Sequence, residues 1–175
     1  RIVVQDIENI KGKKYANYQD EFDYLISSGI ALEVKAISNP KFPLIESSGK
    51  NLLKLYLNDV GIITNILYKY NVGAILNNQE SINLGTVYES LVASELKAHG
   101  FNLFYYDNKT NGEVDFLIDD YDTLSVLPIE VKSGKDYTVH SAMNKFLAIK
   151  DYNVKKGVVL SNERNVYNKD NIIYM

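Results

Sequence analysis

Two stretches in the second half of the chain decide the fold: residues 112–118, which read Gly-Glu-Val-Asp-Phe-Leu-Ile, and residues 128–134, which read Pro-Ile-Glu-Val-Lys-Ser-Gly. Both are rich in apolar and β-branched residues, which is typical of strands. A carboxylate in an apolar strand is costly to bury unless it binds a cation or a polar partner. Asp115 in the first stretch and Glu130 in the second are therefore candidates for a functional site.

The spacing of the charged residues predicts that they gather at one place. Alternate side chains of a strand point to the same face, so Glu130 and Lys132 share one face and the apolar residues beside them take the other. If the two stretches pair as a hairpin, Asp115 can join Glu130 and Lys132. A plainer interpretation remains open, because an acid and a lysine two residues apart also occur on solvated strand faces.

Two carboxylates and a main-chain carbonyl that converge form an oxygen site suited to Mg²⁺ or Mn²⁺, since Mg²⁺ takes few protein ligands and keeps several waters. The candidate ligands in the two strands are Asp115, Glu130 and the carbonyl group of Val131. A lysine beside such an ion can position an attacking water or stabilise charge on a phosphate. We predict this role for Lys132.

A helix is predicted upstream of the two strands. Apolar residues recur at helical spacing from Val87 to Leu96, and the pattern stops before Gly100. Glu89 lies between apolar neighbours in this helix. It is either a surface residue of an amphipathic helix or a further member of the acidic site.

The predicted elements of the second half follow the order helix, three strands, helix, strand, with the last helix over residues 139–150 and the last strand over 157–161. In this order, Asp115 and the Glu-Val-Lys triplet 130–132 resemble the PD-(D/E)XK nuclease superfamily, although Val114 stands where its motif has proline. The resemblance implies an αβββαβ restriction-endonuclease-like core. Its last strand-helix-strand step would supply a right-handed parallel crossover.

The resemblance also assigns roles to individual residues. Members of the superfamily commonly carry a glutamate on the helix before the first core strand, which corresponds to Glu89. The catalytic set implied is Glu89, Asp115, Glu130 and Lys132, and the implied metal ligands are Asp115, Glu130, Val131 and Glu89. Ser133, His140 and Ser141 are weaker candidates for auxiliary polar contacts.

Together with residues 22–31 and 54–61, these segments are similar to the C-terminal domain of unknown function that follows the motor of bacterial and archaeal AAA-type ATPases. The similarity runs from about Tyr18 to Ser161. It implies that an upstream ATPase domain is a partner in the full-length protein, and the start at Arg1 suggests an excised fragment. No Gly-x-x-x-x-Gly-Lys-Ser/Thr phosphate loop occurs in the sequence, so we expect ATP to bind only in the missing upstream region.

The first half is predicted to form a separate unit. We expect a winged-helix-like fragment with a linker over residues 1–80 and the nuclease-like domain over residues 81–175, which gives a mixed α+β or α/β fold. The elements expected in the first half are a helix over 17–28, strands over 30–37 and 52–57, a helix over 59–67 and a linker over 77–81. The earlier helices of a winged-helix module would be either truncated or contributed by residues 5–14.

Composition places the protein among soluble globular domains. Of its 175 residues, 46% are hydrophobic and 23% are charged. The absence of cysteine excludes a disulfide scaffold, a cysteine-based zinc site and a cysteine nucleophile. No apolar run is long enough for a membrane span or a signal segment, so we expect a cytoplasmic protein with no membrane partner.

DNA is the expected substrate and partner, and the expected reaction is metal-dependent hydrolysis of its phosphodiester bonds. The formal net charge of −3 does not favour it, because proteins that bind phosphates usually have a basic surface. Two alternatives remain open. The domain is a catalytically inactive nucleic-acid-binding or protein-binding regulatory module of the ATPase, or it is an adaptor whose tyrosine-rich surface and proline-containing loop contact a partner.

Overall fold

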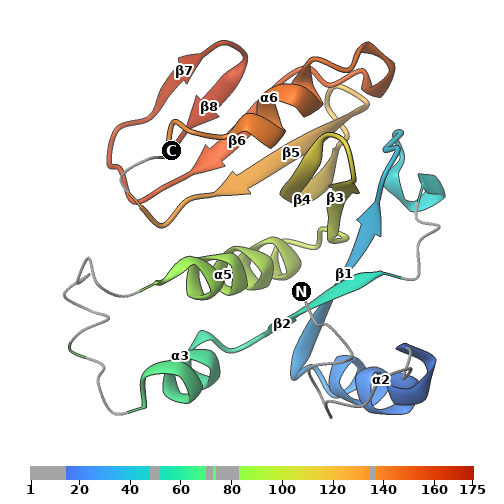
Figure 1. Cartoon of the computed structure of the whole chain (residues 1–175), viewed down its shortest axis with the longest axis vertical. Coiled ribbons are helices and arrows are strands. Elements are labelled where there is room, and N and C mark those ends of the chain that lie inside the picture. Colours follow the sequence, from blue (N-terminus) through green and yellow to red (C-terminus); the bar gives the residue numbers. More distant parts are fainter. Residues whose placement is uncertain (1–14, 48–51, 70–72, 74–82, 135–136) are drawn as a thin grey trace.

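The computed structural model describes residues 15–47, 52–69, 73, 83–134 and 137–175. Within these ranges the chain has a mixed α/β fold, with an eight-stranded, mostly antiparallel sheet and helices on both of its faces (Figure 1). The strands are β1 (Ala31–Ile37), β2 (Leu53–Leu57), β3 (Phe104–Asn108), β4 (Gly112–Asp120), β5 (Ser125–Val131), β6 (Gly157–Leu160), β7 (Tyr167–Lys169) and β8 (Ile172–Tyr174). The α-helices are α2 (Gln19–Ser27), α3 (Val60–Tyr68), α5 (Gly85–Ala98) and α6 (Ser141–Leu147).

The order of the strands in the sheet is β2-β1-β3-β4-β5-β6-β8-β7. Strands β3, β4 and β5 are antiparallel neighbours, and β6 lies parallel to β5 after the crossover through α6. The second half of the chain therefore has the order helix, three strands, helix, strand that the sequence predicts. The assignment of these elements to a nuclease core stays a prediction.

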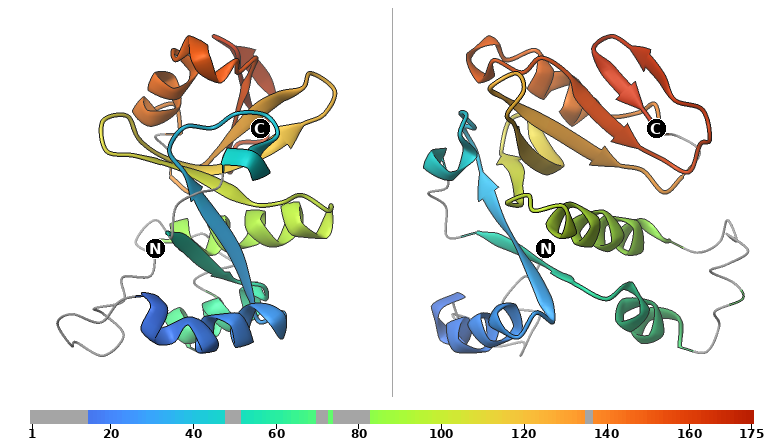
Figure 2. Two further views of the ribbon diagram at one scale, coloured as in Figure 1. Left: turned by 90° about the vertical axis from the view of Figure 1, so that its right-hand side faces the viewer. Right: turned by 180° about the vertical axis from the view of Figure 1, so that it is seen from behind.

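Two buried clusters pack against the sheet, one with α6 and one with α5. Met143 and Phe146 of α6 pack with sheet residues that include Tyr106 and Leu117. Ala93 of α5 packs with Tyr105, Phe116 and Ile129, among others. Because neighbouring residues of one strand belong to different clusters, α5 and α6 cover opposite faces of the sheet (Figure 2).

The strands of the first half extend the same sheet. β1 pairs with β2 in antiparallel orientation and with β3 in parallel orientation, where Ile37 lies opposite Tyr106. Figure 1 shows the consequence: α5 runs between β5 on one side and β2 on the other. The winged-helix identity of this half stays a prediction, and the helices expected within 5–14 and the linker expected over 77–81 lie outside the described residues.

The predicted helix over residues 139–150 is shorter in the structure. α6 ends at Leu147, and Ile149 adopts an extended backbone before a 3₁₀ turn over Lys150–Tyr152. The turn buries Tyr152, whose ring lies 5.2 Å from that of Phe146 and 5.9 Å from that of Tyr106. Aromatic packing into the core therefore replaces the last turn of the expected helix.

The hairpin of β7 and β8 at the C-terminal end is not predicted by the sequence analysis. Its strands are three residues long, too short for an alternating pattern to stand out. Its loop does carry a signal, because Asp170 and Asn171 both have positive φ, as two-residue hairpin loops require. Among the described residues, no helix has both the length and the apolar character to cross a lipid bilayer.

Candidate functional site

The hairpin predicted for the two deciding stretches is present. β4 and β5 pair in antiparallel orientation from Asp120 opposite Ser125 to Phe116 opposite Ile129. One step beyond the last pair, the Asp115 carboxylate accepts a hydrogen bond from the main-chain N–H of Val131 at 2.8 Å. The structure therefore brings Asp115 to the end of β5 that carries the Glu-Val-Lys triplet.

An irregularity in β4 lies next to this contact. Phe104 pairs with Leu117 and Tyr106 pairs with Val114, so β4 has one more residue than β3 between the same two pairs. Such a bulge interrupts the strict alternation of side chains and is common beside functional sites, where it changes the direction of a side chain. The interruption occurs at Asp115, where the carboxylate turns to β5.

Glu130 and Lys132 form an ion pair with a Nζ–Oε1 distance of 2.9 Å. Glu130 is only 7% exposed, so it does not belong to a solvated strand face. Its second oxygen, Oε2, is buried and has no hydrogen-bond partner in the described part of the chain. Lys132 retains 28% of its side-chain exposure. The pair therefore combines a buried carboxylate that has an unused oxygen with an ammonium group that reaches solvent.

Glu89 forms a hydrogen bond with a sheet residue of the first half. It lies on α5, and its Oε2 accepts a hydrogen bond of 2.6 Å from the phenol of Tyr56 on β2. Burial and the neighbouring Glu89 carboxylate raise the pKa of Tyr56. Tyr56 therefore stays a hydrogen-bond donor at physiological pH, and Glu89 is not a free surface residue of an amphipathic helix.

The three acids are close enough to influence one another. Burial, and then repulsion from Glu130 and Glu89, raise the pKa of Asp115 from 3.8 to about 7. The Val131 N–H and the ammonium group of Lys54 act in the opposite direction. The raised pKa therefore reflects the burial of Asp115 first and the two neighbouring carboxylates second.

Lys54 and Glu113 complete this charged region, and the sequence analysis missed both. Lys54 on β2 is 4% exposed, and its Nζ lies 2.6 Å from Glu113 Oε1 and 4.8 Å from the centre of the Tyr105 ring. A signal was present, because Lys54 is a charged residue in an apolar strand and two residues from Tyr56, hence on the same strand face. What the sequence could not reveal is that β2 lies beside α5.

A cavity of about 400 Å³ opens beside these residues, between β2, α3, α5 and β4. Leu57 and Ile63 contribute to its apolar wall. Its polar lining is Lys54, Tyr56, Thr86, Glu89, Ser90 and Glu113.

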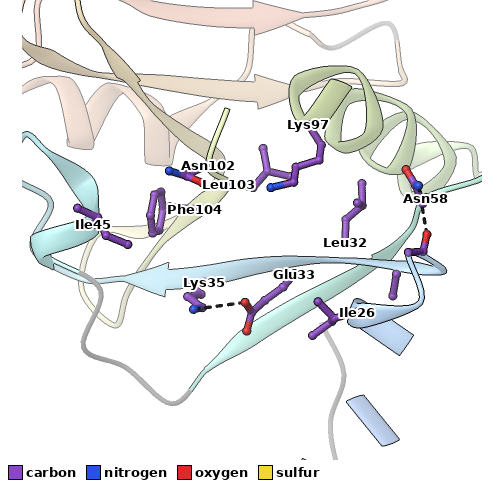
Figure 3. Close-up of a pocket in the computed structure, with 12 residues that line it drawn as sticks. Ile26, Leu32, Glu33, Lys35, Ile45, Asn58, Lys97, Asn102, Leu103 and Phe104 are labelled. Atoms are coloured by element: carbon purple, nitrogen blue, oxygen red, sulfur yellow. Dashed lines mark hydrogen bonds and ion pairs between the residues drawn. The ribbon is translucent and has the colours of Figure 1, made fainter. Parts of the chain in front are cut away.

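A second cavity of about 400 Å³ lies elsewhere, between α2, β1 and the C-terminal end of α5 (Figure 3). Apolar side chains such as Ile26 and Leu32 line it, and the Glu33–Lys35 ion pair, with a distance of 3.3 Å, lies at its edge. None of the predicted catalytic residues lines this second cavity.

The acids are held by protein groups rather than arranged around a metal position. Throughout the described part of the chain, no group of three or more His, Cys, Asp or Glu side chains is arranged to hold a metal ion. Glu89 accepts from Tyr56, Asp115 accepts from Val131, and Glu130 pairs with Lys132. The predicted metal-ligand set therefore stays a prediction. Metal binding would require these carboxylates to exchange their present protein partners for the ion.

The chemistry of the donors nevertheless suits a hard divalent cation. The donors are carboxylate oxygens, which Mg²⁺ and Mn²⁺ prefer, and the Oε2 atom of Glu130 is buried without a partner. In addition, within the described residues, the ammonium groups found beside the four carboxylates of Glu89, Glu113, Asp115 and Glu130 are those of Lys54 and Lys132. When Asp115 is ionised, these four carboxylates and two ammonium groups leave an excess of two negative charges, which one divalent ion would neutralise.

The weaker candidates lie at two places, Ser133 near the start of α5 and the neighbours His140 and Ser141 at the start of α6. His140 is 5% exposed, and its Nε2 is 2.6 Å from the hydroxyl group of Tyr174, so it is buried and not available to a substrate. Ser133 lies near the start of α5, with its Oγ 3.7 Å from the position that a Cβ atom would take at Gly85. Ser141 is the first residue of α6 and is exposed.

Comparison with known proteins assigns the second half of the chain to a family. A family model described as "Domain of unknown function (DUF4143)" matches residues 84–175. No curated protein and no solved structure matches the chain. The matched segment contains Glu89, Asp115, Glu130 and Lys132, whereas Lys54 and Tyr56 lie before it. Because the match covers more than half of the chain, the protein belongs to the family of the domain of unknown function DUF4143.

Proposed function

We propose that the chain is the C-terminal part of an AAA-type ATPase and carries a PD-(D/E)XK nuclease-like domain that hydrolyses DNA phosphodiester bonds with Mg²⁺ or Mn²⁺. One observation carries the proposal: carboxylates from three different elements, Glu89 of α5, Asp115 of β4 and Glu130 of β5, gather in one region with Lys132 beside them. Lys54 lies in the same region, paired with Glu113, so the acids still outnumber the lysines beside them.

The acids would hold the divalent ion. Asp115 and Glu130 are ligands in this proposal, together with the carbonyl of Val131, and Glu89 contacts the ion directly or through a water. The ion, when bound, lowers the pKa of a coordinated water and polarises the phosphate. Binding would require Glu130 to share its carboxylate with the ion, and its unused buried oxygen supports this.

Lys132 would act on the substrate. Its ammonium group is anchored by Glu130 at 2.9 Å and is still partly exposed. An anchored lysine can orient the attacking water or neutralise the charge that develops on the phosphate. The ion pair with Glu130 therefore fixes the position of the lysine before substrate arrives.

The remaining parts of the proposal rest on the sequence. A winged-helix-like character of residues 1–80 is supported by the order of helix α2 and the paired strands β1 and β2. The link to an upstream ATPase domain, and a cytoplasmic location, come from the resemblance and from composition alone.

Metal binding is the first experiment. We would titrate Mg²⁺ and Mn²⁺ into the chain by calorimetry, with Asp115→Ala and Glu130→Ala as test variants. Asp23→Ala is the control, because it removes an exposed acid of α2 that is far in sequence from Asp115 and Glu130. Saturable binding to the wild type and the control, lost in both test variants, supports the proposal, and cleavage of plasmid DNA is then assayed. A folded wild type that binds neither ion contradicts it.

A second candidate function is favoured by the partners that the acids have in the structure. Tyr56, Val131 and Lys132 each engage one of the three carboxylates, as in a domain whose acids serve only to stabilise the fold. The protein would then be a catalytically inactive binding or regulatory module of the ATPase. In that case Asp115→Asn and Glu130→Gln leave DNA binding unchanged, and no metal binds.

A further inference from the structure

The cavity between β2, α3, α5 and β4 has features that the proposed reaction does not use. Its wall includes the first two turns of α5, where Thr86 and Ser90 are four residues apart and so lie on one face of the helix. The Ser90 hydroxyl group is fully buried and has no hydrogen-bond partner among the residues that the structure describes. A buried hydroxyl without a partner costs free energy, so the Ser90 hydroxyl is a donor that a ligand in the cavity can satisfy.

The same cavity contains a buried cation. Lys54 reaches it from β2, rests on the face of Tyr105 and pairs with Glu113. Glu113 is the replaceable member of this pair, because its side chain is 40% exposed whereas that of Lys54 is 5% exposed. The Glu113 carboxylate can therefore swing into solvent and leave the ammonium group to another anion.

The start of α5 favours an anion as well. The N-terminus of a helix carries a partial positive charge and main-chain N–H groups without helical partners. Leu84 at this N-terminus provides no side-chain cap, and the N–H of Gly85 donates to Asn83 Oδ1 at 3.1 Å, so the N–H groups offered to an anion are those after Gly85 in the first turn. Lys54, Ser90 and the first turn of α5 together present the donors that phosphate oxygens accept.

We propose that this cavity binds a second phosphate of the nucleic-acid strand whose scissile phosphate lies at the acids, with Lys54 and Ser90 as its contacts. Glu113 stays paired with the Lys54 ammonium group until a phosphate of the nucleic-acid strand displaces its carboxylate. The apolar residues Leu57 and Ile63 face the sugar.

This inference rests on the proposed function, because Glu89 lies in the same cavity and its charge opposes an anion. A divalent ion at Glu89 and Asp115 removes that repulsion. The strand should therefore bind only weakly without the ion, and the ion and the strand should bind cooperatively.

The test is binding of a fluorescein-labelled eight-nucleotide thymidine strand, followed by anisotropy in saturating Ca²⁺, with the strand checked by gel for cleavage. Lys54→Met should weaken binding about tenfold and Ser90→Ala about threefold, because each removes a phosphate contact. Glu113→Gln should tighten binding about threefold, because it removes the competing carboxylate. Lys35→Met, which removes the lysine of the exposed Glu33 pair on β1, is the matched control and should change little.

The opposite signs expected for Lys54→Met and Glu113→Gln separate phosphate binding from loss of structure, because a damaged fold weakens binding in both variants. No binding by the wild type in saturating Ca²⁺, or an equal loss in Lys54→Met and Lys35→Met, overturns the inference. Calorimetric titration of Mg²⁺ tests the proposed function separately. If Lys54→Met binds Mg²⁺ like the wild type and its affinity for the nucleic-acid strand is also unchanged, Lys54 does not contact a phosphate. The proposed metal site is not affected by that result.

Discussion

The carboxylate of Asp115 accepts a hydrogen bond from the main-chain N–H of Val131. Asp115 directly precedes Phe116, which with Ile129 forms the last residue pair of β4 and β5. A side chain thereby continues the hydrogen bonding of the hairpin where the backbones stop pairing. The contact fixes Asp115 beside Glu130, and it places one of the predicted metal ligands in the hydrogen-bonded framework of the sheet. Replacement of Asp115 should therefore affect both folding and metal binding.

The raised pKa of Asp115 predicts how stability depends on pH. The folded protein holds this proton up to a pKa of about 7, whereas the unfolded chain releases it near 3.8. The folded state binds more protons between these values, so the free energy of unfolding falls as pH rises from about 4 to about 7. Asp115→Asn keeps an oxygen that accepts from Val131 but cannot ionise.

Thermal melts at pH 5, 6, 7 and 8 check this prediction. The melting temperature of the wild type should fall relative to that of Asp115→Asn across this range. Saturating Mg²⁺ should reverse the fall at pH 8, because the ion stabilises the ionised carboxylate. Parallel pH profiles for the two proteins would contradict the shifted pKa.

The Glu130–Lys132 pair predicts an asymmetric response to substitution. Lys132→Met leaves a buried carboxylate without its counter-ion and should cost roughly 2–4 kcal/mol of stability. The double variant Glu130→Gln with Lys132→Met should recover most of this loss, because no uncompensated charge remains. Urea denaturation of the two single variants and the double variant measures the coupling, and additive effects would show that the pair does not interact.

The hydrogen bond from Tyr56 to Glu89 predicts opposite effects on stability and on metal binding. Tyr56→Phe removes a 2.6 Å bond to a carboxylate and should cost about 1–3 kcal/mol. It should also tighten Mg²⁺ binding, because Glu89 no longer shares its oxygen with the phenol. Tyr24→Phe, at a tyrosine that is 66% exposed on α2, is the control for both measurements. Unchanged stability would show that the bond is not formed in solution.

The packing of α6 predicts a large loss of stability on truncation of Phe146. This residue is fully buried, and its ring lies 4.7 Å from that of Tyr106. Phe146→Ala should therefore cost about 3–5 kcal/mol by chemical denaturation. Val139→Ala, at a position just before α6 that is 67% exposed, should stay within about 0.5 kcal/mol of the wild type. Similar values for both variants would contradict the observed docking of α6.

Much of the second half was predictable because its signals are local. Local patterns specify these elements by themselves: alternating apolar residues in β4 and β5, and helical spacing in α5. The position of Asp115 in an apolar run identified it as a candidate site residue. Contacts made through sheet order were not predictable. Lys54 reaches the acids only because β1 lies parallel to β3 and carries β2 to the side of α5, and no local pattern encodes that long-range pairing.

The sheet order also determines how the protein can be divided. The family match begins at Leu84, so the matched segment excludes β1 and β2. Cutting the chain there would remove the neighbour of β3 and leave a row of main-chain donors and acceptors open along an apolar strand, which invites association between molecules. The family-matched segment alone is therefore an unsuitable unit for expression, whereas a boundary before α2 keeps that edge covered.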